Sequence, residues 1–171
     1  MMNRRFALLG LVALVSACGG RSITDQASAS VRAAQLAFAS TDGGRFDPPL
    51  HANETPELRR LINQYADVYE VPRGLVHRII IRESHHRPGA RNGPYYGMMQ
   101  ILPATARGMG FSGPDKGLLD AETNLKYGVK YMRGAWLLAD GNQDTAVKWY
   151  SKGYYYEAKR RGMLKETGLR T

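Results

Sequence analysis

Positions 75–83 read L-V-H-R-I-I-I-R-E and predict a helix with one apolar face. Glu83 follows Ile80 by three positions and Ile79 by four, so its carboxyl extends the face formed by Leu75, Val76, Ile79 and Ile80. Desolvation on such a face disfavours the charged form and raises the pKa of a carboxyl. A carboxyl that keeps its proton near neutral pH can act as a general acid on a glycosidic oxygen. Glu83 is therefore the predicted catalytic residue, and a structural ion pair with a nearby arginine is the alternative.

Residues 1–17 predict a secretory signal rather than part of the folded domain. Arg4 and Arg5 make the start positive, and an apolar run of ten residues follows at 6–15. A run of that length is too short for a bilayer-spanning helix, which needs about 20 residues.

The apolar run ends in Val15-Ser16-Ala17-Cys18, which resembles a bacterial lipobox. The resemblance implies cleavage before Cys18 and lipidation of its thiol. Because Gly19 rather than Asp follows the cysteine, it also implies an outer-membrane lipoprotein that faces the periplasm. An ordinary signal peptide with an incidental cysteine is the alternative.

Composition limits the class of partner. The chain has 24 Lys+Arg against 15 Asp+Glu, and without Arg4 and Arg5 the remainder has 22 against 15, a net charge of +7. A basic surface favours an anionic partner, and export makes nucleic acid a poor choice. Cell-wall peptides with free carboxylates fit the charge better, and a merely soluble basic surface is the alternative. Cys18 is the only cysteine, so a domain without an intrachain disulfide must rely on its core.

The expected domains are a signal peptide at 1–17, a lipid-anchored tether at 18–54 and a catalytic domain at 55–171. No segment alternates long enough to predict a main sheet, so the fold class is all-α, with a small hairpin allowed in 88–98. Thr55-Pro56 has the form of a helix start, and Asp120 that of a helix cap. The predicted helices cover 31–39, the segment from Pro56 past Val68, the segment ending near Glu83, a short piece from Pro103, 120–140, a segment from Asp144 through Tyr150, and 154–163.

Four segments, in order, resemble the catalytic domain of the lytic murein transglycosylases, the SLT-like family related to goose lysozyme. They are Glu83-Ser84, the G-M-M-Q-I-L-P-A-T-A of 97–106, a segment from Leu119-Asp120 through Asn124 to Tyr131-Met132, and Ala146 with Tyr150-Ser151-Lys152-Gly153. The resemblance covers roughly residues 55–165. Each motif is modest alone, but four in register are specific.

The sequence departs from the family pattern at several positions. Ser151 stands where the family usually has Asn, and Met98 replaces Leu, a change that conserves volume. The stretch between Glu83 and Gly97 is about one residue shorter than the common pattern. Asn92 lies near a position where many members have Ser.

The resemblance implies cleavage of the β-1,4 bond between N-acetylmuramic acid and N-acetylglucosamine in peptidoglycan glycan strands. The C6 hydroxyl of the muramic acid attacks, which gives a 1,6-anhydro end, and Glu83 serves first as acid and then as base. No second acid occurs in the matched motifs, although most glycosidases need two. A muramidase that uses water on the same fold, or a non-catalytic peptidoglycan-binding envelope protein, remains the alternative.

The predicted substrate-binding residues come from the matched motifs. Gly97 would let backbone approach the sugar, Gln100 could pair with an acetamido group, and the Tyr150 phenol could hydrogen-bond Glu83 or the substrate. Core packing is the alternative for Tyr150. The remaining candidates are Ser84, Asn92 and Met99, for which capping or core packing is the alternative, and the stacking candidates Tyr95-Tyr96 and Tyr154-Tyr155-Tyr156.

His85-His86 beside Glu83 raises the question of a metal. Adjacent histidines on a helix point in different directions, whereas zinc ligands on one helix usually lie at i and i+4. No metal and no cofactor are therefore expected. The expected partner is peptidoglycan, with membrane contact through the lipid anchor only, no nucleic acid, and a monomeric protein.

Overall fold

The structure is a computed structural model that describes residues 23–40 and 48–170. The predicted signal peptide and the predicted lipidation site at Cys18 lie outside the described residues. None of the described helices has the length and apolar character needed to cross a membrane.

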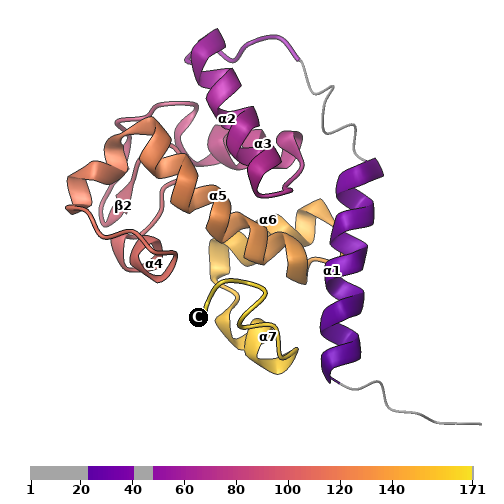
Figure 1. Ribbon diagram of the computed structural model, residues 1–171. Helices are drawn as coiled ribbons and strands as arrows, with labels where there is room; N and C mark the ends of the chain where they lie inside the picture. The colour runs from indigo at the N-terminus through magenta and orange to yellow at the C-terminus, as the bar shows by residue number, and fades with distance from the viewer. Residues whose placement is uncertain (1–22, 41–47, 171) are drawn as a thin grey trace, which may run out of the picture.

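The described chain is mainly helical, which confirms the all-α class (Figure 1). The predicted hairpin is present as two strands of two residues, β1 and β2, with Arg91 opposite Tyr96 and Asn92 opposite Tyr95. The elements are α1 Ile23–Ser40, α2 Pro56–Val68, α3 Arg73–Ser84, β1 Arg91–Asn92, β2 Tyr95–Tyr96, α4 Pro103–Gly108, the 3-10 helix η1 Asp115–Leu119, α5 Ala121–Leu138, α6 Gln143–Lys152 and α7 Tyr155–Arg160.

Helix α5 runs through the middle of the molecule, with α1, α2 and α6 packed against it, and α3 packs on α2 and α6 (Figure 1). Asp120 caps it as predicted, since its Oδ1 accepts a hydrogen bond of 2.8 Å from the Thr123 N–H. Gly134 lets the Tyr154 ring pack directly on the helix, because a Cβ there would lie 2.3 Å from the Tyr154 hydroxyl oxygen. The core therefore extends along most of α5.

Helices α2 and α3 begin and end as the local sequence dictates. The Thr55 hydroxyl accepts a hydrogen bond of 3.2 Å from the Leu58 N–H, and Pro56 opens α2. The four apolar residues predicted for the face of α3 are fully buried. Helix α3 ends in two successive left-handed residues, His85 at φ 53° and His86 at φ 58°, which turn the chain sharply just after Glu83.

Asn124 on α5 holds the loop that follows the hairpin. Its Oδ1 accepts from the Met99 N–H at 2.8 Å, and its Nδ2 donates to the carbonyls of Tyr96 at 2.8 Å and Leu118 at 2.9 Å. Gly97 is needed for this packing, because its φ is +71° and a Cβ would lie 2.2 Å from Asn124 Nδ2. The sequence predicted that Gly97 leaves room for a sugar. In the structure the missing side chain leaves room for the Asn124 amide instead.

The folded body reaches further toward the N-terminus than the predicted boundary. Residues 23–30, predicted as tether, are the first turns of α1, and α1 packs against α5. Ala34 is buried, and Arg161 Nη1 donates to the Ser30 hydroxyl at 3.3 Å. Small residues at the start of α1 had the composition of a linker, but they allow close packing against another helix.

Several boundaries differ from the prediction by a few residues. Helix α6 is capped by Asn142, whose Oδ1 accepts from the Thr145 N–H at 2.8 Å, so the helix starts before Asp144. The 3-10 helix at 115–119 was not predicted, and α7 is shorter than the predicted 154–163. The differences in α6 and α7 lie at element ends, where local patterns are weakest, whereas the 3-10 helix is a short element that was missed entirely.

Replacing Asn124 with Ala should destabilise the fold by about 3 kcal/mol, because the buried Met99 N–H and the Leu118 carbonyl lose the side-chain partner, while the Tyr96 carbonyl keeps only the Ile101 N–H. Asn142→Ala is the matched control, since it removes an N-cap at the surface and should cost about 1 kcal/mol. Urea unfolding of both variants measures the difference. Equal losses in the two variants would show that Asn124 is no more than a local cap.

Candidate active site

Three adjoining hollows form a groove across the molecule, with volumes of about 610, 320 and 300 Å³. The first two share Glu83, Asn92 and Gln100 among their lining residues. The second and third share Tyr95, Gln100, Tyr150 and Ser151. Glu83 thus lies where two hollows meet, and the groove extends to both sides of it. This shape fits an extended polymer better than a compact small molecule.

Glu83 sits on the last turn of α3 with 23% of its side chain exposed. Partial burial raises the pKa of its carboxyl above the ordinary value, and the Arg82 guanidinium acts in the opposite direction. The Arg82 Nε atom lies 3.6 Å from Glu83 Oε1, beyond good hydrogen-bond distance. The carboxyl is therefore accessible, partly desolvated and inclined to keep its proton, as a general acid requires.

Gln100 lines all three hollows. Its Nε2 donates to the carbonyls of Gly97 at 2.7 Å and Ala90 at 3.2 Å, which fixes the orientation of the amide. Its backbone adopts φ 47°, an uncommon conformation for a residue other than glycine. The amide oxygen has no hydrogen-bond partner among the described residues. The oxygen is itself buried, so the fixed amide shapes the groove wall, and a ligand N–H would reach this oxygen only if neighbouring atoms moved.

Tyr150 lines the second and third hollows, but its hydroxyl is already engaged. It donates to the Met99 carbonyl at 2.7 Å, so the predicted hydrogen bond to Glu83 or substrate is not the one observed. Burial, with smaller contributions from Glu83 and Tyr131, raises the pKa of the phenol well above its ordinary value. The residue supports the floor of the groove and stays protonated.

The structure brings Glu83, Asn92, Gln100 and Tyr150 together at the groove, while Ser84, Gly97 and Met99 do not line it. Ser84 is buried and its hydroxyl donates to the Ile80 carbonyl at 3.3 Å, the local capping alternative. The Met99 side chain is fully buried, and its sulfur fills the space that a Cβ on Gly128 would occupy. Their positions support the groove from behind and do not suit side-chain contact with a sugar.

Two further residues line the groove: Tyr95, which was predicted only as a stacking candidate, and Asn53, which was not predicted. Tyr95 is 42% exposed and lines the second and third hollows, whereas Tyr154 is buried in the core. Asn53 lines the largest hollow from a segment that the sequence placed in the tether, and its Nδ2 donates to the His85 carbonyl at 2.9 Å. No local pattern in the sequence links Asn53 to Glu83, because the contact is made by tertiary packing.

The groove is basic apart from its single acid. Among the described residues that line the three hollows, Glu83 is the only carboxylate, and Arg82, Arg87, Arg91 and Lys152 supply positive charge. This distribution favours a substrate that carries negative groups on both sides of the reacting bond.

A group of potential metal ligands lies next to the groove, although no metal was expected. His86, which lines the largest hollow, is buried with His77 and Glu54. Burial lowers the pKa of both imidazoles, although Glu54 acts in the opposite direction. For Glu54, burial opposes ionisation, but hydrogen bonds from Arg59 and the His51 N–H lower its pKa overall.

The described chain is a helical domain with a basic groove that carries one carboxylate, Glu83. The profile of the family described as Transglycosylase SLT domain matches residues 60–165, more than half of the chain, and the chain belongs to this family. Membership supports a transglycosylase-like or lysozyme-like activity related to peptidoglycan. No solved structure gave a significant match to the chain.

Replacing Arg82 with Gln should move the alkaline limb of the pH–activity profile to higher pH. The guanidinium lowers the pKa of Glu83, so its removal leaves burial unopposed and extends the range in which the acid holds its proton. Arg78→Gln is the control, because Arg78 lies on the same helix but pairs with Asp144. The measurement is kcat/KM on purified cell wall as a function of pH. An alkaline limb that stays in place or moves down would contradict this role for Arg82.

Replacing Glu83 with Gln should stabilise the fold at pH 8 and have little effect at pH 4. A folded-state pKa above the unfolded value means that the stability contribution of Glu83 is complete below the unfolded pKa and is lost as pH rises through the folded pKa. An amide does not titrate and avoids that loss. Glu57→Gln should have the opposite sign at pH 8, because hydrogen bonds at the start of α2 lower the pKa of Glu57. Thermal unfolding at the two pH values tests both signs.

Proposed function

We propose that this protein is a peptidoglycan lytic transglycosylase that cleaves the β-1,4 bond between N-acetylmuramic acid and N-acetylglucosamine and leaves 1,6-anhydro ends. The observation that carries the proposal is the single carboxylate among the described groove-lining residues, Glu83, at the junction of two hollows. The family match supports the substrate class.

The absence of a second groove carboxylate in the described chain favours an internal nucleophile over water. A retaining hydrolase places two carboxyl groups about 5–5.5 Å apart, and an inverting one about 6.5–9.5 Å apart. Glu54 is a buried acid that follows the groove residue Asn53 in the chain, but it does not line any of the three hollows. Both of its carboxylate oxygens accept hydrogen bonds from Arg59. A hydroxyl supplied by the substrate removes the need for a second acid.

In the proposed reaction Glu83 first donates its proton to the glycosidic oxygen as the bond from that oxygen to muramic C1 breaks. The C6 hydroxyl oxygen of the same muramic acid then forms a bond to C1, and its proton passes to Glu83. The carboxyl ends in its starting state, and no water is consumed. Partial burial supports both steps, because it raises the pKa of the Glu83 carboxyl toward the working pH. A carboxyl with such a pKa can both donate a proton and accept one.

The remaining groove residues have roles that follow from their chemistry. Asn92 offers both a donor and an acceptor next to the acid, and the fixed amide of Gln100 shapes the adjoining wall of the groove. The half-exposed ring of Tyr95 offers a surface on which a sugar face can stack. Arg87, Arg91 and Lys152 attract the carboxylates of the wall peptides.

The proposed location follows from the sequence alone. Cys18 in its lipobox-like setting would tether the domain to the inner face of the outer membrane, where it meets the wall. Helix α1 would then lie between the lipid and the catalytic body, since it starts at Ile23 and packs on α5.

Digestion of purified peptidoglycan should release fragments with 1,6-anhydro ends, each lighter by one water than a hydrolysed product. Mass spectrometry of the fragments measures this directly. Glu83→Gln should lower the rate by about 10²–10⁴-fold, because it removes the acid and base without changing the shape of the side chain. Glu57→Gln, an exposed change on α2 away from the groove, should leave the rate unchanged.

The outcomes separate the proposed activity from its two rivals. Hydrated, reducing muramic ends would identify a muramidase that uses water. A wild-type protein that sediments with peptidoglycan but releases no fragments, and a Glu83→Gln variant that binds equally well, would identify a binding protein.

A further inference from the structure

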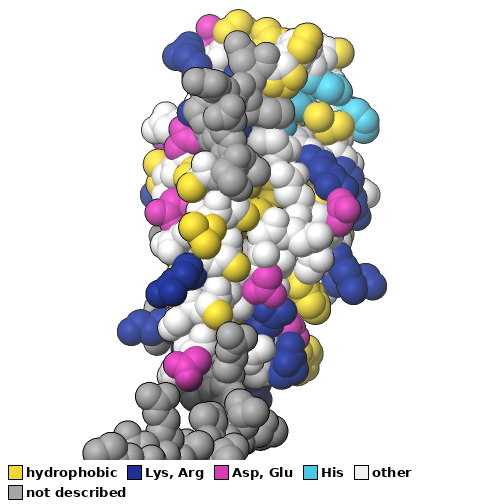
Figure 2. Space-filling model, turned by 90° about the vertical axis from the view of Figure 1, so that its right-hand side faces the viewer, with side chains coloured by type: hydrophobic (Ala, Val, Ile, Leu, Met, Phe, Trp, Pro, Cys, Tyr) yellow, Lys and Arg dark blue, Asp and Glu magenta, His cyan; other side chains and the backbone are white. Residues whose placement is uncertain are grey.

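All four histidines of the chain gather in one place, around the end of α3. The His51 and His86 ring centroids lie 4.9 Å apart, those of His77 and His86 5.4 Å, and those of His51 and His85 5.9 Å. Figure 2 shows the exposed part of this group as one histidine patch at the surface. Histidines distant in sequence converge here only through tertiary packing, and imidazole is the protein ligand that zinc, copper and nickel prefer.

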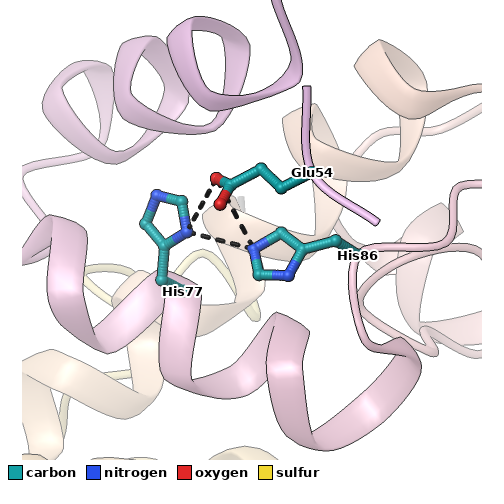
Figure 3. A group of neighbouring side chains, drawn as sticks. All are labelled: Glu54, His77 and His86. Carbon is teal, nitrogen blue, oxygen red and sulfur yellow. Dashed lines mark hydrogen bonds and ion pairs between the residues drawn. The ribbon is translucent and has the colours of Figure 1, made fainter. Parts of the chain in front are cut away.

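Three ligand atoms of this group face one another from three segments (Figure 3). His77 Nδ1 lies 3.2 Å from His86 Nε2 and 3.4 Å from Glu54 Oε1, and His86 Nε2 lies 3.7 Å from that oxygen. All three side chains are buried: 3% of the His77 side chain is exposed, and 1% of each of the His86 and Glu54 side chains.

The separations have the size that a zinc ion requires. Three atoms at these distances lie on a circle with a radius of about 2.0 Å, which is close to a Zn–N or Zn–O bond length. An ion near the centre of that circle would reach all three atoms without any large movement of the side chains. Two histidines and one carboxylate also form an established donor set for zinc, with a fourth position left for water.

The groups around the three ligands orient them. His77 Nε2 lies 3.1 Å from Asn63 Oδ1, so this nitrogen carries the proton and Nδ1 presents its lone pair to the cluster. The Glu54 carboxylate is held by Arg59 and by the His51 N–H. In His86 a zinc-binding Nε2 leaves the proton on Nδ1, which is buried without a hydrogen-bond partner among the described residues, so a water is the expected partner of that N–H.

We propose that Glu54 Oε1, His77 Nδ1 and His86 Nε2 bind a zinc ion that ties the segment before α2 to α3 and to the turn after it. The ion would stabilise the two successive left-handed residues at 85 and 86, and it would fix the groove wall formed by His86 and Asn53 beside Glu83. Arg59 already balances the charge of Glu54, so the added cation is only partly neutralised, and the affinity is expected to be below that of fully thiolate structural sites.

Zinc binding is tested on the full chain, purified in detergent without a histidine tag and stripped with a chelator. The wild type should retain about one zinc per chain after dialysis against ZnCl₂ and should unfold at a higher temperature with zinc than without. His86→Asn and His77→Asn should weaken binding at least tenfold. His85→Asn is the matched control, because His85 is the exposed neighbour that contributes no ligand, and it should bind as the wild type does.

Two results would overturn the site: no zinc retained by the wild type, or equal retention by the wild type and all three variants, which indicates adventitious surface binding. If a buried histidine variant does not fold, Co²⁺ replaces zinc in the wild type and in His85→Asn. Intense visible absorption of four-coordinate cobalt in both proteins supports the site, and the spectrum of cobalt in buffer rejects it. Because no arm measures cleavage, the result is independent of the proposed enzymatic function.

Discussion

The three hydrogen bonds of Asn124 hold together the parts from which the groove is made. Residues 97–99 lie outside the hairpin, which is only two residues deep, and Tyr96 pairs with Ile101 in a single antiparallel bridge. One amide on α5 satisfies the Met99 N–H and the carbonyls of Tyr96 and Leu118, and the Tyr150 hydroxyl on α6 satisfies the Met99 carbonyl. These two side chains add to the few backbone hydrogen bonds of the loop and hold it against α5 and α6. Tyr95 and Gln100, on either side of the loop, line one hollow together with Glu83.

Glu83 reflects a conflict between stability and chemistry. An acid at the end of a fully buried apolar face is partly removed from water, and the fold becomes less stable whenever that acid ionises. The groove tolerates this because Arg82 limits the effect and because the apolar residues of α3 stabilise the helix on their own. The same partial burial raises the pKa of the carboxyl, as the proposed role of general acid requires.

Local patterns were sufficient to predict most of the helices and the position of Glu83 on α3. The spacing of apolar residues on α3, Thr55-Pro56 at the start of α2 and Asp120 at the start of α5 each act within a few residues, so they can be read without the fold. The roles of Ser84, Gly97 and Met99 could not be read in this way. They belong to motifs that contain groove residues, but burial decides that they support the groove and do not face it.

The sequence by itself determined the helical class, the position of Glu83 at the end of the apolar face of α3, and the family, because each depends on short-range periodicity or on motifs in order. Only the tertiary structure decided that α1 belongs to the folded body, that Asn53 forms part of the groove wall, and that Glu54 and His77 meet His86. The physical reason is that these contacts join segments whose separation in the chain carries no periodic signal. Their partners are chosen by the packing of whole helices, which no local pattern encodes.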